Sequence, residues 1–101
     1  MNPNLTIPRE QMAAFCRKHG IRRLAIYGSA LREDFGPDSD VDVLVEFEPA
    51  RIPTLFDLAG MEQEFSTLLG GRKADLRTPG DLSRYFRQEV MEEAEVQYEA
   101  G

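Results

Sequence analysis

The chain has 101 residues, of which 42% are hydrophobic, so it is long enough for one small domain with a packed core, spanning residues 1–101. It carries 12 Lys and Arg against 18 Asp and Glu, and this net charge of −6 argues against nonspecific binding to DNA or RNA. The single cysteine, Cys16, excludes an internal disulfide, and one Cys with one His cannot form a zinc site alone.

The first predicted element is a helix that begins at Pro8 and ends before Gly20. Proline suits the first helical position, and glycine suits the position just beyond the end of a helix. Its apolar face combines Met12, Phe15 and Cys16. The expected elements after it are a strand at 21–27, a short helix at 29–34, a strand at 41–47, a helix at 54–69, a strand at 73–78, a helix at 83–94 and a strand at 96–98. The helix at 54–69 has its apolar positions at Leu55, Leu58, Ala59, Phe65, Leu68 and Leu69. The helix at 83–94 has them at Tyr85, Phe86, Val90 and Met91. This order predicts an α/β (α+β) fold in which helices pack on one face of a small mixed sheet.

Two aspartates open the second predicted strand, in the sequence Asp40-Val41-Asp42. Strand side chains alternate between faces, so Asp40 and Asp42 share one face while Val41 and Val43 share the other. Adjacent carboxylates repel each other, and an unpaired carboxylate within an apolar strand is costly. A divalent cation bound by carboxylate oxygens would offset that repulsion. The pattern therefore predicts a metal site at Asp40 and Asp42.

Other metal and phosphate motifs do not match this region. A calcium-binding EF-hand that begins at Asp38 would need Gly at its sixth position and Glu at its twelfth, where this chain has Val43 and Pro49. No P-loop sequence is present. Asp38 itself, after Gly-Pro, is typical of a turn.

Asp75 is a candidate third carboxylate, in the sequence Lys73-Ala74-Asp75-Leu76-Arg77. A site that holds two metal ions usually needs such a ligand. If this strand pairs beside the strand at 41–47, Asp75 reaches an ion shared with Asp40 and Asp42. The alternative is a surface aspartate that pairs with a neighbouring cation, Lys73 or Arg77, and both interpretations stay open.

The Gly28-Ser29 pair ends the first predicted strand and suits a phosphate group. Glycine lets phosphate oxygens approach the backbone, and a helix that starts at Ser29 offers N–H donors and a favourable dipole. By itself such a pair is only a helix N-cap. The return of carboxylates at Asp40 and Asp42, after a ten-residue gap, favours a phosphate site. Arg32 is then either a phosphate contact or an ordinary surface charge.

The chain combines Gly28-Ser29, a gap of ten residues, Asp40-x-Asp42 and a later Asp75. This combination resembles the sequence pattern of the polymerase-beta-like nucleotidyltransferase superfamily. The surrounding phrases LAIYGSALRE, PDSDVDVLVEFEP, LFDL and KADLRTP resemble the minimal nucleotidyltransferases (MNT proteins) of prokaryotic toxin–antitoxin pairs. The likeness extends over nearly the whole chain, from residue 8 to residue 98.

The resemblance implies a site for ATP and two Mg²⁺ ions. Asp40 and Asp42 would be the metal ligands, Asp75 would bind one ion and favour deprotonation of the acceptor hydroxyl, and Gly28 and Ser29 would hold the β- and γ-phosphates. The acceptor then attacks the α-phosphorus in line and pyrophosphate leaves. MNT proteins are typically paired with a HEPN-domain toxin, a ribonuclease, and some transfer AMP from ATP to a toxin tyrosine. Our hypothesis is that this chain is a Mg-dependent protein adenylyltransferase and the antitoxin of such a pair.

Two competing functions stay open. The chain could neutralise a HEPN toxin by contact alone, with a vestigial site, although the three clustered carboxylates favour an enzyme. Transfer to a small molecule is a further option, but such relatives usually carry an additional helical domain, for which 101 residues leave little room. The sequence does not determine which nucleotide is preferred or which group is the acceptor. It also does not determine the oligomeric state, and self-association stays open.

The cellular location is predicted from what the chain lacks. No apolar run approaches membrane-spanning length, and the first residues have no signal-peptide pattern. We therefore expect a soluble, cytoplasmic protein that contacts neither a membrane nor nucleic acid directly.

Overall fold

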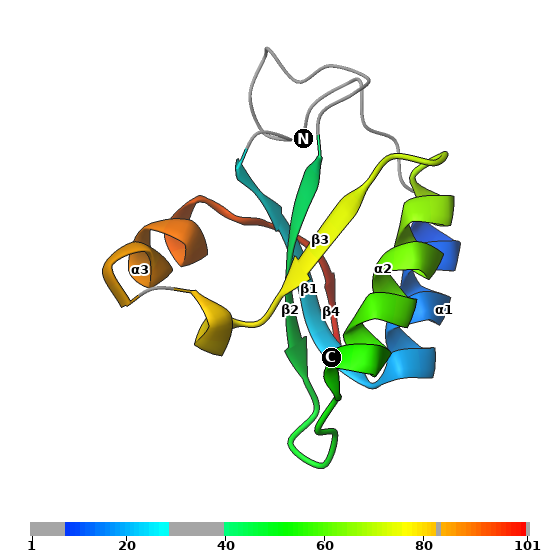
Figure 1. Cartoon of the computed structure of the whole chain (residues 1–101), viewed down its shortest axis with the longest axis horizontal. Helices are drawn as coiled ribbons and strands as arrows, with labels where there is room; N and C mark the ends of the chain where they lie inside the picture. The colour runs from blue at the N-terminus through cyan, green and yellow to red at the C-terminus, as the bar shows by residue number, and fades with distance from the viewer. Residues whose placement is uncertain (1–7, 29–39, 83, 101) are drawn as a thin grey trace.

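The four strands form one mixed sheet in the order β3-β2-β1-β4 (Figure 1). This computed structural model describes residues 8–28, 40–82 and 84–100, apart from the side chain of Phe86. The elements within these ranges are α1 (Arg9–His19), β1 (Ile21–Tyr27), β2 (Val41–Phe47), α2 (Leu55–Leu68), β3 (Ala74–Arg77), the 3-10 turn η2 (Pro79–Asp81), α3 (Arg84–Glu93) and β4 (Glu95–Glu99). The predicted mixed α/β architecture is confirmed.

The ends of α1 are set by its local sequence. Pro8, predicted at the first helical position, is instead the N-cap, one position before the first helical residue. Gly20 ends the helix in the left-handed conformation with φ 68°. Only glycine adopts this conformation without steric cost. Phe15 and Cys16 are buried, as their spacing predicts. Burial raises the pKa of the Cys16 thiol to about 12, so this cysteine is an unreactive core side chain.

β1 and β2 form an antiparallel pair at the centre of the sheet, and β4 adds to the other side of β1. β3 pairs with β2 in parallel. A parallel pair needs a crossover connection, and α2 supplies it by carrying the chain back from the end of β2 to the start of β3. The condition on which the predicted role of Asp75 depends, that the third strand pairs beside the second, is therefore met.

α2 begins at a reciprocal cap. The Thr54 hydroxyl accepts a hydrogen bond from the Asp57 N–H at 3.1 Å, and the Asp57 carboxylate accepts one from the Thr54 N–H at 2.8 Å. Met61 and Phe65, four residues apart, are the buried residues of the helix, whereas Leu55 in the first turn is 85% exposed. The predicted inclusion of Leu55 in the buried face is wrong, because the face that meets the sheet starts further along the helix.

The hydrophobic core lies between the sheet and the pair α1 and α2, which cover the same face (Figure 1). Leu24, Ile26 and Val43 point into it from the strands and are fully buried. The rings of Phe15 and Phe65 meet there, with centroids 5.3 Å apart. α1 and α2 thus follow the predicted one-sided arrangement, whereas α3 lies on the opposite side of the sheet (Figure 1).

The predicted helix at 83–94 is observed as α3. Val90 and Met91 are partly buried, but Tyr85 is 85% exposed, so it is not part of an apolar face. The side chain of Phe86 and the helix predicted at 29–34 lie outside the described residues. No helix within the described ranges is long and apolar enough to cross a membrane.

Candidate active site

A row of three polar side chains crosses the sheet at one end. The register pairs Tyr27 of β1 with Asp42 of β2, and Asp42 with Asp75 of β3. Residues paired in this way lie about 4.8 Å apart and point to the same face. That face is opposite the one on which Val41 and Val43 are fully buried. The structure therefore brings Asp42 and Asp75 side by side.

The environment of Asp42 disfavours ionisation of its carboxyl group. Burial is the largest cause that raises its pKa, followed by the negative charge of Asp75, while Arg77 lowers the pKa and Asp40 raises it. The pKa of the Tyr27 hydroxyl is raised by the same burial and by Asp42. A cation bound among these carboxylates would favour the ionised form of Asp42.

Asp40 lies just before β2 and is exposed. Val41 pairs with Ala74, which places Asp40 beside Lys73, and Lys73 Nζ is 4.0 Å from Asp40 Oδ2. Because both side chains are largely in solvent, this ion pair adds little to stability. Lys73, which the sequence suggested as a partner for Asp75, thus approaches Asp40.

Gly28 touches the same cluster from the end of β1. Its φ is +73°, and a Cβ atom placed there would lie 2.5 Å from Asp42 Oδ2. Any other residue would therefore displace the carboxylate as well as strain the backbone. This contact is a reason for glycine at this position in addition to the predicted approach of phosphate.

The chemistry of these donors suits a divalent cation. Mg²⁺ prefers carboxylate oxygens. Asp42 and Asp75 lie on two adjacent strands, and Asp40 comes directly before the first of them, at the same end of the sheet. In the described part of the chain no three His, Cys, Asp or Glu side chains already form a metal-binding group. The three aspartates therefore have the ligand chemistry and the strand positions that a divalent cation needs. Their side chains would have to move closer together to share one ion.

Two residues of the site were not recognised from the sequence. Tyr27 was not among the predicted site residues, yet it is half-buried in the same row as the two aspartates. Arg77, considered only as a surface partner of Asp75, carries the positive charge that acts on Asp42 and Tyr27. Its position two residues after Asp75 was the available signal, since such residues share a strand face. Ser29 and Arg32, the other predicted nucleotide contacts, lie outside the described residues.

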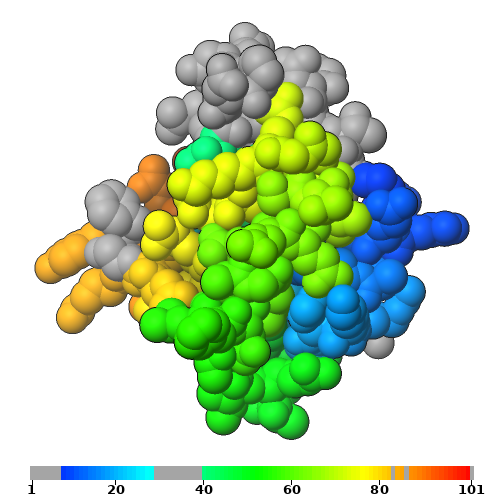
Figure 2. All heavy atoms as spheres, turned by 45° about the vertical axis from the view of Figure 1, so that its right-hand side comes forward, coloured from blue at the N-terminus to red at the C-terminus, as the bar shows by residue number. Residues whose placement is uncertain are grey.

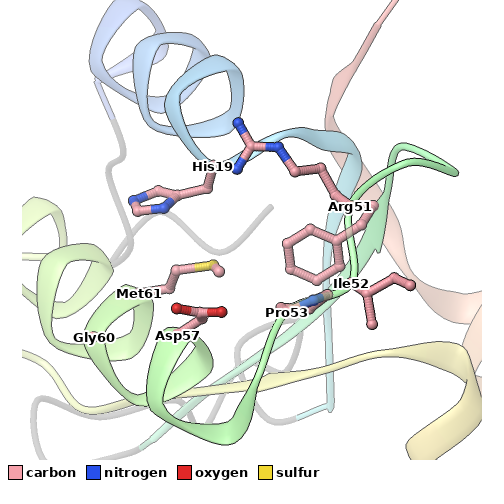
Figure 3. Close-up of a pocket in the computed structure, with 8 residues that line it drawn as sticks. His19, Arg51, Ile52, Pro53, Asp57, Gly60 and Met61 are labelled. Atoms are coloured by element: carbon pink, nitrogen blue, oxygen red, sulfur yellow. The ribbon is translucent and has the colours of Figure 1, made fainter.

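A separate pocket of about 190 Å³ lies at the opposite end of β2. His19, Arg51 and Asp57 surround it, with Met61 between them (Figure 3). His19 Nε2 is 2.7 Å from Glu64 Oε2 and Asp57 caps α2, so these polar groups make structural contacts. The pocket contains none of the three carboxylates described above.

Comparisons with known proteins find relatives in sequence and in fold. A family model described as "Nucleotidyltransferase domain" matches residues 9–96. The protein adenylyltransferase MntA of Thermococcus cleftensis is 36% identical over 76 residues, which are 75% of this chain and 74% of that protein.

Solved structures show the same fold. A candidate minimal nucleotidyltransferase superimposes with a TM-score of 0.70 and 36% identity, over 86% of each chain. A toxin–antitoxin complex with AMP-PNP superimposes with a TM-score of 0.74 over 93% of this chain and 75% of the other, at 16% identity. At 16% identity, this second similarity shows a common fold.

Proposed function

Because this chain belongs to the nucleotidyltransferase domain family, we propose that it transfers AMP from ATP to a tyrosine hydroxyl of a HEPN-domain toxin and so acts as its antitoxin. The observation that carries the proposal is the register that sets Asp42 beside Asp75 on the face opposite α1 and α2. The 36% identity to a protein adenylyltransferase supports AMP as the transferred group. Structures of the same fold that are described as toxin–antitoxin complexes, one of them with a HEPN toxin, support the partner.

The residues of the site divide between metal and phosphate binding. Asp40, Asp42 and Asp75 would hold two Mg²⁺ ions, and when bound these ions neutralise charge on the triphosphate and on the attacking and leaving oxygens. Gly28, which has no side chain, leaves room for both the Asp42 carboxylate and a phosphate group. Ser29 and Arg32 are proposed as further phosphate contacts.

In the proposed reaction the tyrosine oxygen forms a bond to the α-phosphorus of ATP. The bond between that phosphorus and the bridging oxygen breaks, and pyrophosphate leaves. Asp75, on the edge strand, accepts the hydroxyl proton, since it is the member of the row that an incoming acceptor can approach from outside the sheet.

A role by contact alone does not account for the carboxylate row. Half-buried Asp42 beside Asp75 is unfavourable for folding at neutral pH, and partner binding would not need it. A catalytic metal site does need it, which is why we propose an enzyme.

The proposal is tested by transfer of label from α-labelled ATP to the HEPN-domain protein encoded in the same genome, in the presence of Mg²⁺. Wild-type protein should label the partner, and the Asp40→Asn/Asp42→Asn variant should lose at least about a thousandfold in rate, as expected when transition-state charge is no longer stabilised. Arg22→Gln, on the exposed surface of β1, serves as a control that should keep the rate. Equal labelling by the double variant would show that the carboxylates are not the site.

A further inference from the structure

Lys73 lies beside one of the carboxylates that we propose as metal ligands. Its Nζ is 4.0 Å from Asp40 Oδ2, and the two side chains are 74% and 47% exposed. The yellow segment that includes β3 lies at the surface of the molecule in Figure 2. The ammonium group of Lys73 is therefore accessible to solvent and to an incoming ligand.

The register of the sheet fixes the position of this lysine. The Lys73 carbonyl accepts a hydrogen bond from the Val41 N–H at 2.9 Å, and Ala74 pairs with Val41 in the parallel ladder. Asp40 directly precedes Val41, so the lysine and the aspartate leave two adjacent strands side by side. The contact between their charges follows from strand pairing.

Lys73 and a divalent cation compete for the same carboxylate. A cation that binds Asp40 must displace the ammonium group, and two positive charges at close range repel each other. In the metal-free protein Lys73 also neutralises part of the negative charge at Asp40. Both effects weaken the binding of Mg²⁺ alone.

A triphosphate offers Lys73 a different partner. Mg²⁺ that bridges carboxylate and phosphate oxygens lies about 2.1 Å from each, so phosphate oxygens come within about 4 Å of Asp40. The four-carbon stem of lysine is flexible, and its ammonium group can turn from the carboxylate to a phosphate oxygen at that distance. A charge-assisted hydrogen bond to phosphate then offsets the lost contact with Asp40.

We propose that Lys73 couples metal binding to nucleotide binding: it pairs with Asp40 in the metal-free protein and binds a phosphate oxygen of ATP once the carboxylates hold Mg²⁺. The inference rests on the proposed function and adds to it a residue that binds the nucleotide. Lys73 thus disfavours Mg²⁺ alone and favours Mg²⁺ together with ATP.

The test removes the ammonium group and measures the two binding events separately, without the partner protein. Because Lys73 is exposed, Lys73→Gln should leave the fold intact. Its Kd for Mg²⁺ alone should fall about threefold at low ionic strength, since a repelling charge is lost. Its Kd for α,β-methylene-ATP, an analogue that cannot release pyrophosphate, should rise about threefold at saturating Mg²⁺, since a phosphate contact is lost. Titration calorimetry measures both constants.

Two further variants serve as controls. Lys73→Arg keeps the positive charge and should keep both constants close to those of the wild type. Lys18→Gln removes the other lysine of the chain, which pairs with Glu64 at 3.0 Å between α1 and α2. It changes the net charge equally and should leave both constants unchanged.

A Kd for Mg²⁺ that is unchanged or raised in Lys73→Gln would overturn the inference. Unchanged binding of the analogue, or equal shifts in Lys18→Gln, would overturn it as well. Wild-type protein that binds neither Mg²⁺ nor the analogue would contradict the proposed function instead, so the two failures are distinguishable.

Discussion

Asp42 combines partial burial with neighbouring carboxylates, and both raise its pKa. A carboxyl group whose pKa is raised on folding binds protons more tightly in the folded than in the unfolded state. Its ionisation therefore destabilises the fold, and stability falls as the pH rises through the raised pKa. Functional sites often retain such unfavourable groups because their chemistry requires them.

We therefore expect Asp42→Asn to increase the free energy of unfolding at pH 7 in the absence of Mg²⁺, by about 1 kcal/mol, the scale of an ordinary single substitution. The gain should shrink in acid, where the wild-type carboxyl becomes neutral. Mg²⁺ should stabilise the wild type more than the variant, since only the wild type keeps both paired carboxylates. Urea unfolding at neutral and acidic pH measures these differences.

Asp40→Asn is the matched control, because Asp40 is exposed and lies near Lys73. It should stabilise the protein less than Asp42→Asn does, because Asp40 is the smallest of the causes that raise the pKa of Asp42. A loss of stability in Asp42→Asn at pH 7, or a gain that does not change with pH, would contradict the account of Asp42.

The relative placement of the predicted site residues follows from the sequence where strand alternation determines it. Asp40 and Asp42 share a face because they are two residues apart, and this needed no tertiary information. The approach of Gly28 to Asp42 could not be predicted in the same way, because it depends on the antiparallel register of β1 and β2. For the same reason Tyr27 was not recognised as a neighbour of the carboxylates.

At the scale of elements, α1 and α2 are joined by charged side chains beside the core. Lys18 Nζ and His19 Nε2 contact the two carboxylate oxygens of Glu64, at 3.0 Å and 2.7 Å. The hydrogen bond with His19 is the largest cause that lowers the pKa of Glu64, and Lys18 lowers it further. A carboxyl group with a lowered pKa stabilises the fold above its ordinary pKa, and this contribution is lost as the pH falls through the lowered value.

Glu64→Gln should accordingly destabilise the protein at pH 7. The difference from wild type should shrink as the pH falls below the ordinary glutamate pKa of 4.5 and vanish below the lowered value. Because Glu64 is partly exposed, we expect an effect below about 1 kcal/mol. Unfolding curves of both proteins from pH 7 to pH 3 measure it. A variant as stable as wild type at pH 7, or a difference that persists unchanged at pH 3, would show that the contact with His19 and Lys18 does not stabilise the fold.

The position and type of the elements could largely be predicted, because apolar runs and Gly or Pro residues mark their limits. The bounds of β1 and β2 agree with the prediction residue by residue. The exposure of Leu55 and Tyr85 could not be predicted, since apolar spacing shows that a helix has an apolar face but not which part meets the sheet. The pairing of β3 with β2 could not be predicted from the sequence. It was stated only as the condition under which Asp75 would join Asp40 and Asp42.

At the scale of the whole molecule, two helices cover one face of the sheet (Figure 1). The strand register places the carboxylate row on the other face. Which face of β2 is buried follows from the sequence, because Val41, Val43 and Val45 alternate with Asp40 and Asp42. The side on which α3 lies does not follow, because it depends on the path of the chain through η2.

The central claim is that this face transfers a nucleotidyl group rather than a phosphoryl group. The most direct test incubates the protein with Mg²⁺, the HEPN-domain protein from the same genome, and ATP labelled at either the α- or the γ-phosphate. Our account predicts that the α-label appears on a tyrosine of the partner and that the γ-label leaves as pyrophosphate. Label from the γ-phosphate on the partner, or no label from the α-phosphate, would contradict it.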